Sequence, residues 1–366
     1  MKKERRYDID WIRVIVFDTL IFYHVGMFFV EWDWHIKNNE VVEWVKYPML
    51  FINQWRIPIL FVVSGMGTRF ALSHRNAKEY NKERISRLLI PLVFGMLIIV
   101  PPQVYIERLT QGNLFSSYFH FYPHYFDGIY PKGNFSWHHL WFLPYLLLMS
   151  IIATPIFIYF RKENNKFILR IRNLIDKIPL VLYFGVIPLI VIQLLLADKF
   201  PVTHALIDDW FAIPYYFSLF ILGYLLICCE TSFWRSVLRI RLWTLSIGII
   251  AYLLLISLPE NSPLYEIIKV TNMWSWILTI FGFSSKYLNQ ESELIKYRNK
   301  AVYPFYILHQ TITIICGYFL LNLSIHYSVK MLIMVIVTFG GSWLLYEFLI
   351  LRVNFIQPFF GVKRKT

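Results

Sequence analysis

Long apolar segments limit the possible folds of this chain more than any other feature of its sequence. Each is about 20 residues long, which is enough to cross a bilayer as an α-helix. Hydrophobic residues make up 57% of the chain and the mean hydropathy is +0.50, well above an ordinary soluble domain. We therefore predict an all-α, polytopic membrane bundle of about ten helices. The expected spans lie near residues 11–30, 50–71, 88–106, 139–160, 179–197, 210–228, 242–258, 266–284, 301–323 and 330–351.

Basic residues are distributed very unevenly between the connections of this predicted bundle. Alternate segments, beginning with the N-terminus, hold 26 Lys and Arg, whereas the opposite loops hold about 6. Cytoplasmic loops of membrane proteins carry this excess, so we predict that both termini are cytoplasmic. We interpret the basic start MKKERR and the run after it as an uncleaved first span, because no small-residue cleavage site follows.

The remaining composition narrows the organisation and the partners. No Gly/Ser-rich linker interrupts the chain, so we expect one membrane domain over residues 1–366. The net charge of +13 is spread over short loops rather than one soluble face, which argues against nucleic-acid binding. The three cysteines have neither zinc-ligand nor redox spacing, so we expect no disulfide framework and no metal site.

Ionisable residues occur within the first apolar span, DWIRVIVFDTLIFYH. Arg13 and His24 are eleven residues apart, which places them on one helix face with about 16 Å of rise between them. Asp10 precedes Arg13 by one turn and can pair with it, whereas Asp18 points elsewhere. Snorkelling of Arg13 and a structural hydrogen bond from His24 are the alternatives. Together, however, such costly residues indicate a polar cavity.

Further polar residues fit the same cavity. The second span, NQWRIPILFVVSGMG, places Arg56 toward its outer half and Ser64 further in, beside a glycine that permits close helix packing. Glu107, at the outer end of the third span, is one candidate partner for Arg56. His309 in the ninth span either lines a cavity or makes a structural hydrogen bond. For His138 and His139, at an outer interface, we favour structural roles over metal binding.

Two arginines in KERISRLLIP begin the third span. Arg84 and Arg87 are one helical turn apart at the cytoplasmic edge. Such positions are ordinary under the positive-inside rule, but two guanidinium groups on one face also form a good phosphate clamp.

These motifs together resemble the acyltransferase-3 family of membrane O-acyltransferases. DWIRVIVFDTLIFYH resembles the family's Arg-x10-His pattern, and RISR resembles its Arg-x-x-Arg motif. FVVSG, HHLWFLPYLL, YPFYILHQT and LLYEFLILR extend the similarity along the chain, toward the branch that contains a glucan-succinylating protein of bacterial envelopes. The resemblance implies a ten-helix enzyme of the bacterial inner membrane that moves an acyl group from cytoplasmic acyl-CoA to a hydroxyl of an extracytoplasmic glycan.

Acyl transfer to an alcohol needs a base, stabilisation of the developing oxyanion and an anchor for the donor. His24 suits the first task because imidazole titrates near neutrality, and an acyl-His24 intermediate is the alternative. Arg13, Arg84 and Arg87 suit the last task, since CoA is polyanionic. The donor is then acetyl-CoA or succinyl-CoA, used as a substrate and not held as a permanent cofactor.

Two other classes of function remain open at this stage. Deep charges also serve a transporter or flippase of a polar envelope substrate, and a scaffold protein is the third possibility. Consumption of acyl-CoA by the purified protein separates the first class from the other two.

The distribution of basic residues predicts the outcome of a topology experiment. Reporter fusions at residues 80, 170 and 290 are expected to report the cytoplasm, and fusions at 40, 125 and 204 the outside. The reversed pattern would overturn both the orientation and the assignment of Arg84 and Arg87 to the cytoplasmic face.

Overall fold

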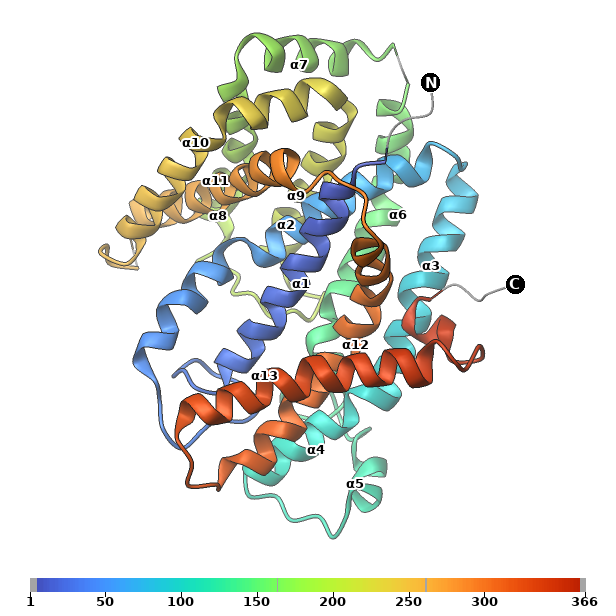
Figure 1. Ribbon diagram of the computed structural model, residues 1–366, viewed down its shortest axis with the longest axis vertical. Helices are drawn as coiled ribbons and strands as arrows, with labels where there is room; N and C mark the ends of the chain where they lie inside the picture. Colours follow the sequence, from blue (N-terminus) through green and yellow to red (C-terminus); the bar gives the residue numbers. More distant parts are fainter. Residues whose placement is uncertain (1–4, 163, 261, 363–366) are drawn as a thin grey trace. The chain divides into compact units, whose positions relative to one another are not determined.

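The computed structural model describes residues 5–162, 164–260 and 262–362, and within them the chain is helical (Figure 1). The described residues contain no β-strand beyond one isolated bridge between Ile129 and Phe135. The α-helices are α1 (Tyr7–Met27), α2 (Lys46–Leu72), α3 (Ala77–Phe94), α4 (Pro101–Thr110), α5 (Tyr118–His124), α6 (Phe142–Phe160), α7 (Lys166–Lys177), α8 (Val186–Leu196), α9 (Ala212–Cys228), α10 (Glu230–Leu255), α11 (Pro263–Tyr287), α12 (Glu293–Leu321) and α13 (Tyr327–Leu344).

Short helices of other types extend or join these elements. The 3₁₀-helices are η1 (Glu43–Val45), η3 (His138–Trp141), η4 (Pro179–Gly185) and η6 (Gln357–Phe360), and the π-helices are η2 (Gly95–Ile99) and η5 (Leu345–Ile350). The π-turn η2 precedes two prolines, Pro101 and Pro102, which lack the amide hydrogens that continue a regular ladder. Helices α3 and α4 follow one another through η2 and together form one long helical element.

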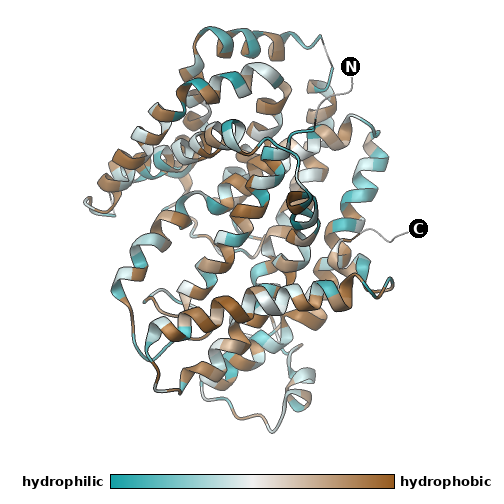
Figure 2. Ribbon diagram, in the orientation of Figure 1, coloured by the Kyte–Doolittle hydropathy of each residue, from teal (hydrophilic) through white to brown (hydrophobic). Residues whose placement is uncertain are grey.

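Helices cover all of the expected spans, which confirms the all-α prediction. Among the described residues, 7 helices are long and apolar enough to cross a membrane, and Figure 2 shows how apolar residues predominate along α13. Three expected spans are not among these seven. They are α1, α9 and α11. Helix α1 carries the charged residues Asp8, Asp10, Arg13 and Asp18, and α9 has only 17 residues. A total of ten spans and the orientation of the termini stay predictions.

The chain divides into two compact units, and helices α1, α2 and α3 each contribute residues to both. The first unit contains the N-terminal residues up to Val16, with Asn53–Arg84 and Tyr145–Lys296. Within it, α10 packs along α11, and both contact neighbouring helices of the same unit, α7 beside α10 and α8 beside α11 (Figure 1).

Helices α2 and α9 of the first unit approach each other through two glycines. A Cβ atom at Gly65 would lie 2.0 Å from the carbonyl oxygen of Phe220, and one at Gly223 would lie 2.0 Å from that of Val62. The two backbones are therefore in direct contact, as small residues allow between membrane helices.

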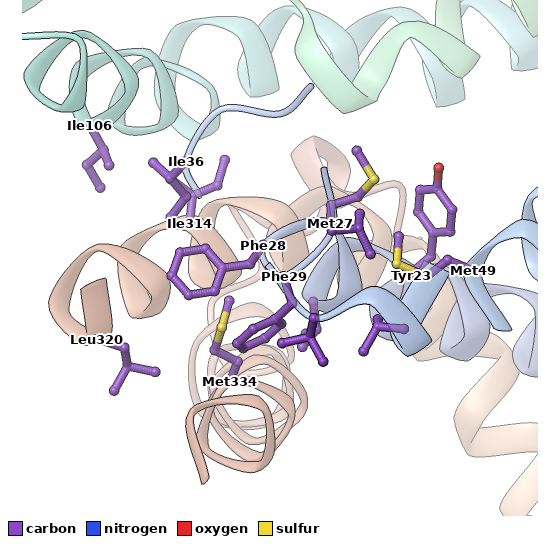
Figure 3. Packing of buried hydrophobic residues seen from close by; sticks show 14 residues of the cluster. Tyr23, Met27, Phe28, Phe29, Ile36, Met49, Ile106, Ile314, Leu320 and Met334 are labelled. Atoms are coloured by element: carbon purple, nitrogen blue, oxygen red, sulfur yellow. The ribbon is translucent and has the colours of Figure 1, made fainter. Parts of the chain in front are cut away.

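The second unit contains Phe17–Ile52, Ile85–Pro144 and the segment from Tyr297 onward. Its apolar core surrounds the end of α1 (Figure 3). Phe28 and Phe29, each 1% exposed, pack with Met334 of α13 and Ile314 of α12. The chain after α1 folds back here, because the amide groups of Asn38 and Val42 donate to the carbonyls of Phe28 and Phe29. This packing fixes the end of α1 beside α12.

The glycine contact yields a prediction about stability. Gly223→Leu is expected to lower the free energy of unfolding by about 3 kcal/mol or more, because the new side chain meets backbone that cannot move aside. Thermal unfolding of the purified protein in detergent measures this. Gly340→Leu on α13 is the matched control, because no atom lies within 4 Å of its Cβ position. Equal losses in both variants would contradict the argument.

Candidate active site

Two histidines of the second unit meet inside the bundle. The Nδ1 atom of His24, in the last turn of α1, lies 2.8 Å from Nε2 of His309 on α12. The two rings are within 15° of parallel. His24 also lies nearly parallel to the ring of Trp34, with an angle of 12° between the planes and 6.4 Å between the centroids. His309 itself is completely buried.

The backbone of α12 determines which nitrogen atoms of this pair carry protons. Nδ1 of His309 lies 2.8 Å from the carbonyl oxygen of Tyr306 and 3.2 Å from that of Phe305. A carbonyl oxygen only accepts, so this Nδ1 is the protonated nitrogen and Nε2 of the neutral ring is an acceptor. Nδ1 of His24 must then donate to it. In the neutral pair, the basic lone pair of His24 is therefore on Nε2.

A network of amide and hydroxyl side chains surrounds His309. Gln103 of α4 donates from Nε2 to the hydroxyl of Thr311 at 2.7 Å, and its Oε1 accepts from Gln310 at 3.0 Å. His139 lies edge-on to His309, with ring centroids 5.2 Å apart, and its Nε2 lies 3.1 Å from the carbonyl of Ile307. These buried polar groups satisfy one another, which gives the site a defined geometry.

Glu107 lies in the second unit, in contact with the loop that follows α1. Its Oε2 is 2.5 Å from Nδ1 of His35, and its Oε1 accepts from the hydroxyl of Tyr130 at 3.1 Å. Burial, reinforced by the Glu107 carboxylate, raises the pKa of Tyr130, so this hydroxyl keeps its proton and donates. Nε2 of His35 accepts from Gln310 at 3.1 Å, which connects Glu107 to the network around His309.

Asp18 and His309 line the same small cavity between α1 and α12. Asp18 is paired across this cavity with Arg298, at 2.5 Å between Oδ1 and Nη2. The structure thus brings together two of the residues singled out from the sequence. Arg298 therefore offsets the charge of Asp18, whose side chain is 30% exposed.

Arg13 and Asp10 belong to the part of α1 that lies in the first unit. Nη1 of Arg13 is 3.6 Å from Oδ1 of Asp10, and Asp10 also receives Arg5 at 2.7 Å. The guanidinium group lies over Gly67 of α2, because a Cβ atom there would be 2.7 Å from its Nη2. Arg13 and His24 are on the one continuous helix α1, as their spacing predicts.

The remaining expected residues are distributed over both units. On α3, Arg84 reaches the hydroxyl of Thr68 at 3.4 Å and lies over the ring of Tyr80, whereas Arg87 is exposed. Arg56 donates to Asn53 at 3.0 Å within α2. Ser64, on the same helix, accepts through its carbonyl from Thr68 at 3.0 Å.

Several residues of this network were not selected from the sequence. They are Trp34, His35, Gln103, Tyr130, Gln310 and Thr311. The signal that could have found some of them is the presence of amide side chains in apolar spans, since a buried amide is costly unless it is hydrogen-bonded. Gln310 directly follows His309, and Gln103 follows the two prolines of the third span.

The His24 pair is equipped for proton transfer. A base that is oriented through its second nitrogen by another side chain is the arrangement that activates hydroxyl nucleophiles in hydrolases and transferases. The buried network supplies the fixed orientation that such a base needs.

Comparisons with known proteins connect this geometry to a family. Residues 6–347 match the model of the acyltransferase-3 family, which is described as an acyltransferase domain. Relatives named glucans biosynthesis protein C include those of Escherichia coli O1:K1, 23% identical, and Escherichia coli O139:H28 (strain E24377A), 24% identical. The protein of that name from Shigella dysenteriae serotype 1 is 23% identical. Each match covers 86% of this chain and 83% of the relative.

No solved structure matches the chain at a significant level. The family match covers nearly all of the chain, and the apolar helices place the protein in a membrane with several passes. The chain belongs to the acyltransferase-3 family and is a membrane acyltransferase.

Proposed function

We propose that this enzyme transfers an acyl group, acetyl or succinyl, from cytoplasmic acyl-CoA to a hydroxyl of an extracytoplasmic glycan. The observation that carries the proposal is the His24–His309 pair, in which the backbone of α12 fixes the proton positions. The names of the relatives, which refer to glucan biosynthesis, support a glycan as acceptor. A position in the bacterial inner membrane follows from a cytoplasmic donor and an acceptor outside.

His24 acts as the general base in this proposal. Its Nε2 takes the proton of the acceptor hydroxyl while the hydroxyl oxygen attacks the thioester carbonyl. The carbon–sulfur bond then breaks, and the thiolate leaves with that proton as CoA thiol. His309 stabilises the transient imidazolium through the Nδ1–H of His24. In an acyl-carrier route, the same Nε2 is instead the nucleophile.

Arg84, Arg87 and Arg13 anchor the donor in this proposal. A guanidinium group binds phosphate through two parallel hydrogen bonds, and CoA is polyanionic at its nucleotide end. On α3, Arg87 is exposed and Arg84 is half-buried. The side chain of Arg84 is already oriented by its contacts with Thr68 and Tyr80. About 16 Å of helix rise separates Arg13 from His24, a distance suited to an extended carrier arm.

The histidine pair predicts a large loss of turnover in a variant that keeps its fold. His24→Asn is expected to lower kcat by about 10²–10⁴-fold, because the amide can still donate to His309 but cannot accept a proton in catalysis. His24→Ala is a less specific test, because it also removes the hydrogen bond from His24 to the buried Nε2 of His309 and so can destabilise the fold. Acyl transfer in reconstituted lipid vesicles is the measurement.

Variants of the second histidine serve as controls. His309→Gln keeps an acceptor for His24 and is expected to retain more activity than His309→Leu, which removes it. Wild-type turnover by folded His24→Asn protein would refute the catalytic assignment. Movement of the glycan across vesicles without consumption of acyl-CoA would favour a flippase. An acyl group trapped on His24 without acceptor would select the carrier route.

The arginine pair predicts weaker donor binding. Replacing both Arg84 and Arg87 with Gln is expected to raise the dissociation constant of CoA about 100-fold, since each lost charge-assisted contact is worth roughly 1.5 kcal/mol. Lys at both positions restores part of the affinity through charge alone. Isothermal titration with CoA measures both effects.

Arg235 and Arg239 on α10 provide the matched control for that double substitution. Both are exposed basic residues of one helix, so replacing them with Gln changes net charge by the same amount. CoA affinity that falls equally in both double variants would show that only overall charge matters.

A further inference from the structure

A second cluster of buried polar side chains lies outside the proton-transfer pair. His35, Glu107 and His138 each offer a potential ligand atom, and these three atoms lie within 4.8 Å of one another. His35 comes from the loop after α1, Glu107 from α4 and His138 from the first position of η3. The rings of His35 and His138 are nearly perpendicular, with centroids 4.3 Å apart.

His138 has a ring nitrogen that the folded chain does not use. Its Nε2 is buried and has no hydrogen-bond partner among the described residues. Buried ring nitrogens are nearly always paired, so an orphan of this kind calls for an explanation. The backbone of His138 has a φ of 39°, in the left-handed region that is unfavourable for residues other than glycine. The chain thus adopts an unfavourable backbone conformation at a histidine that has an unpaired ring nitrogen and lies beside Glu107 and His35.

The other two proposed ligands are held in place by hydrogen bonds to neighbouring side chains. Gln310 donates to Nε2 of His35 at 3.1 Å, which leaves Nδ1 as the nitrogen that faces Glu107. Oε1 of Glu107 accepts from Tyr130 at 3.1 Å and from Gln111 at 3.3 Å, which leaves Oε2 toward His35. These hydrogen bonds fix the orientation of both side chains before an ion is bound.

We propose that His35, Glu107 and His138 bind a divalent transition-metal ion of the zinc class. Two imidazoles and one carboxylate are a donor set suited to zinc, whereas magnesium and calcium prefer oxygen ligands alone. The ion takes the place of the hydrogen bond between Nδ1 of His35 and Oε2 of Glu107. The ring proton of His35 then lies on Nε2, and the amide of Gln310 turns its oxygen toward it to accept. Three protein ligands leave a fourth position for an oxygen ligand.

The required movement is small. A four-coordinate ion about 2.1 Å from each ligand keeps ligand atoms about 3.4 Å apart. The 2.5 Å separation of His35 Nδ1 and Glu107 Oε2 therefore opens by about 0.9 Å on binding. We assign this movement to His35, whose side chain is 13% exposed, because that of Glu107 is only 4% exposed.

Metal content tests the proposal with the full-length protein, purified through a tag that contains no histidine. After removal of metal with a chelator, titration with Co²⁺ is expected to give the absorption bands of a four-coordinate site at about one ion per chain. Zinc is expected to displace the cobalt. Inductively coupled plasma mass spectrometry measures the zinc retained after desalting.

Variants of the cluster make the test specific. His138→Ala and Glu107→Gln are each expected to abolish the cobalt bands, and Tyr130→Phe is expected to weaken binding about 10-fold by removing the support of Glu107. His124→Ala is the matched control and should bind as wild type does. His124, the last residue of α5, is exposed and lies 2.8 Å from the carboxylate of Asp127.

Either of two results would overturn the proposal. A wild-type chain without one tight site, or a His138→Ala chain that binds cobalt as wild type does, excludes a metal at this cluster. Size-exclusion profiles in detergent show whether each variant is folded. Glu107→Gln keeps the shape of the side chain and so remains informative if His138→Ala does not fold. Neither readout depends on the acyl donor or acceptor.

Discussion

The candidate site depends on one hydrogen bond, from Nδ1 of His309 to the carbonyl oxygen of Tyr306. Because that acceptor belongs to the backbone of α12, it cannot change its role by rotating or by exchanging a proton. The direction of the bond between His309 and His24 follows from it, and so does the position of the lone pair on His24. His309 here takes the place that a buried carboxylate has in serine hydrolases, and the helix backbone orients His309.

The packing around the end of α1 holds His24 in place beside His309. Phe28 and Phe29 anchor the end of the helix in an apolar core, and Trp34 returns from the following loop to face His24. The same loop carries His35 into the cluster with Glu107. One short segment after α1 therefore contributes a residue to both sites, Trp34 beside His24 and His35 in the proposed metal site. Gln310 of α12 connects the two sites through its hydrogen bond to His35.

Sequence reasoning predicted the helices and the family well because both depend on local patterns. Apolar runs specify helices in a membrane, and the spacing of Arg13 and His24 needs only the helical repeat. The number of spans is harder, since the charged residues of α1 make that helix resemble a surface helix in composition. His309 could not be assigned a role, because its partner lies 285 residues away. The expectation of no metal site rested on cysteine spacing and on His138 and His139 alone. His35 and Glu107, 72 residues apart, meet only because the loop after α1 folds against α4.

The glycine contact between α2 and α9 has a consequence for genetic suppression. At Gly26 the obstacle to a larger residue is the flexible side chain of Met49, so a smaller residue at position 49 can make room for it. At Gly65 the obstacle is the backbone carbonyl of Phe220, which every residue carries. Second-site suppressors of a Gly65 substitution must therefore shift a whole helix, and selection should recover them far from position 220 or not at all.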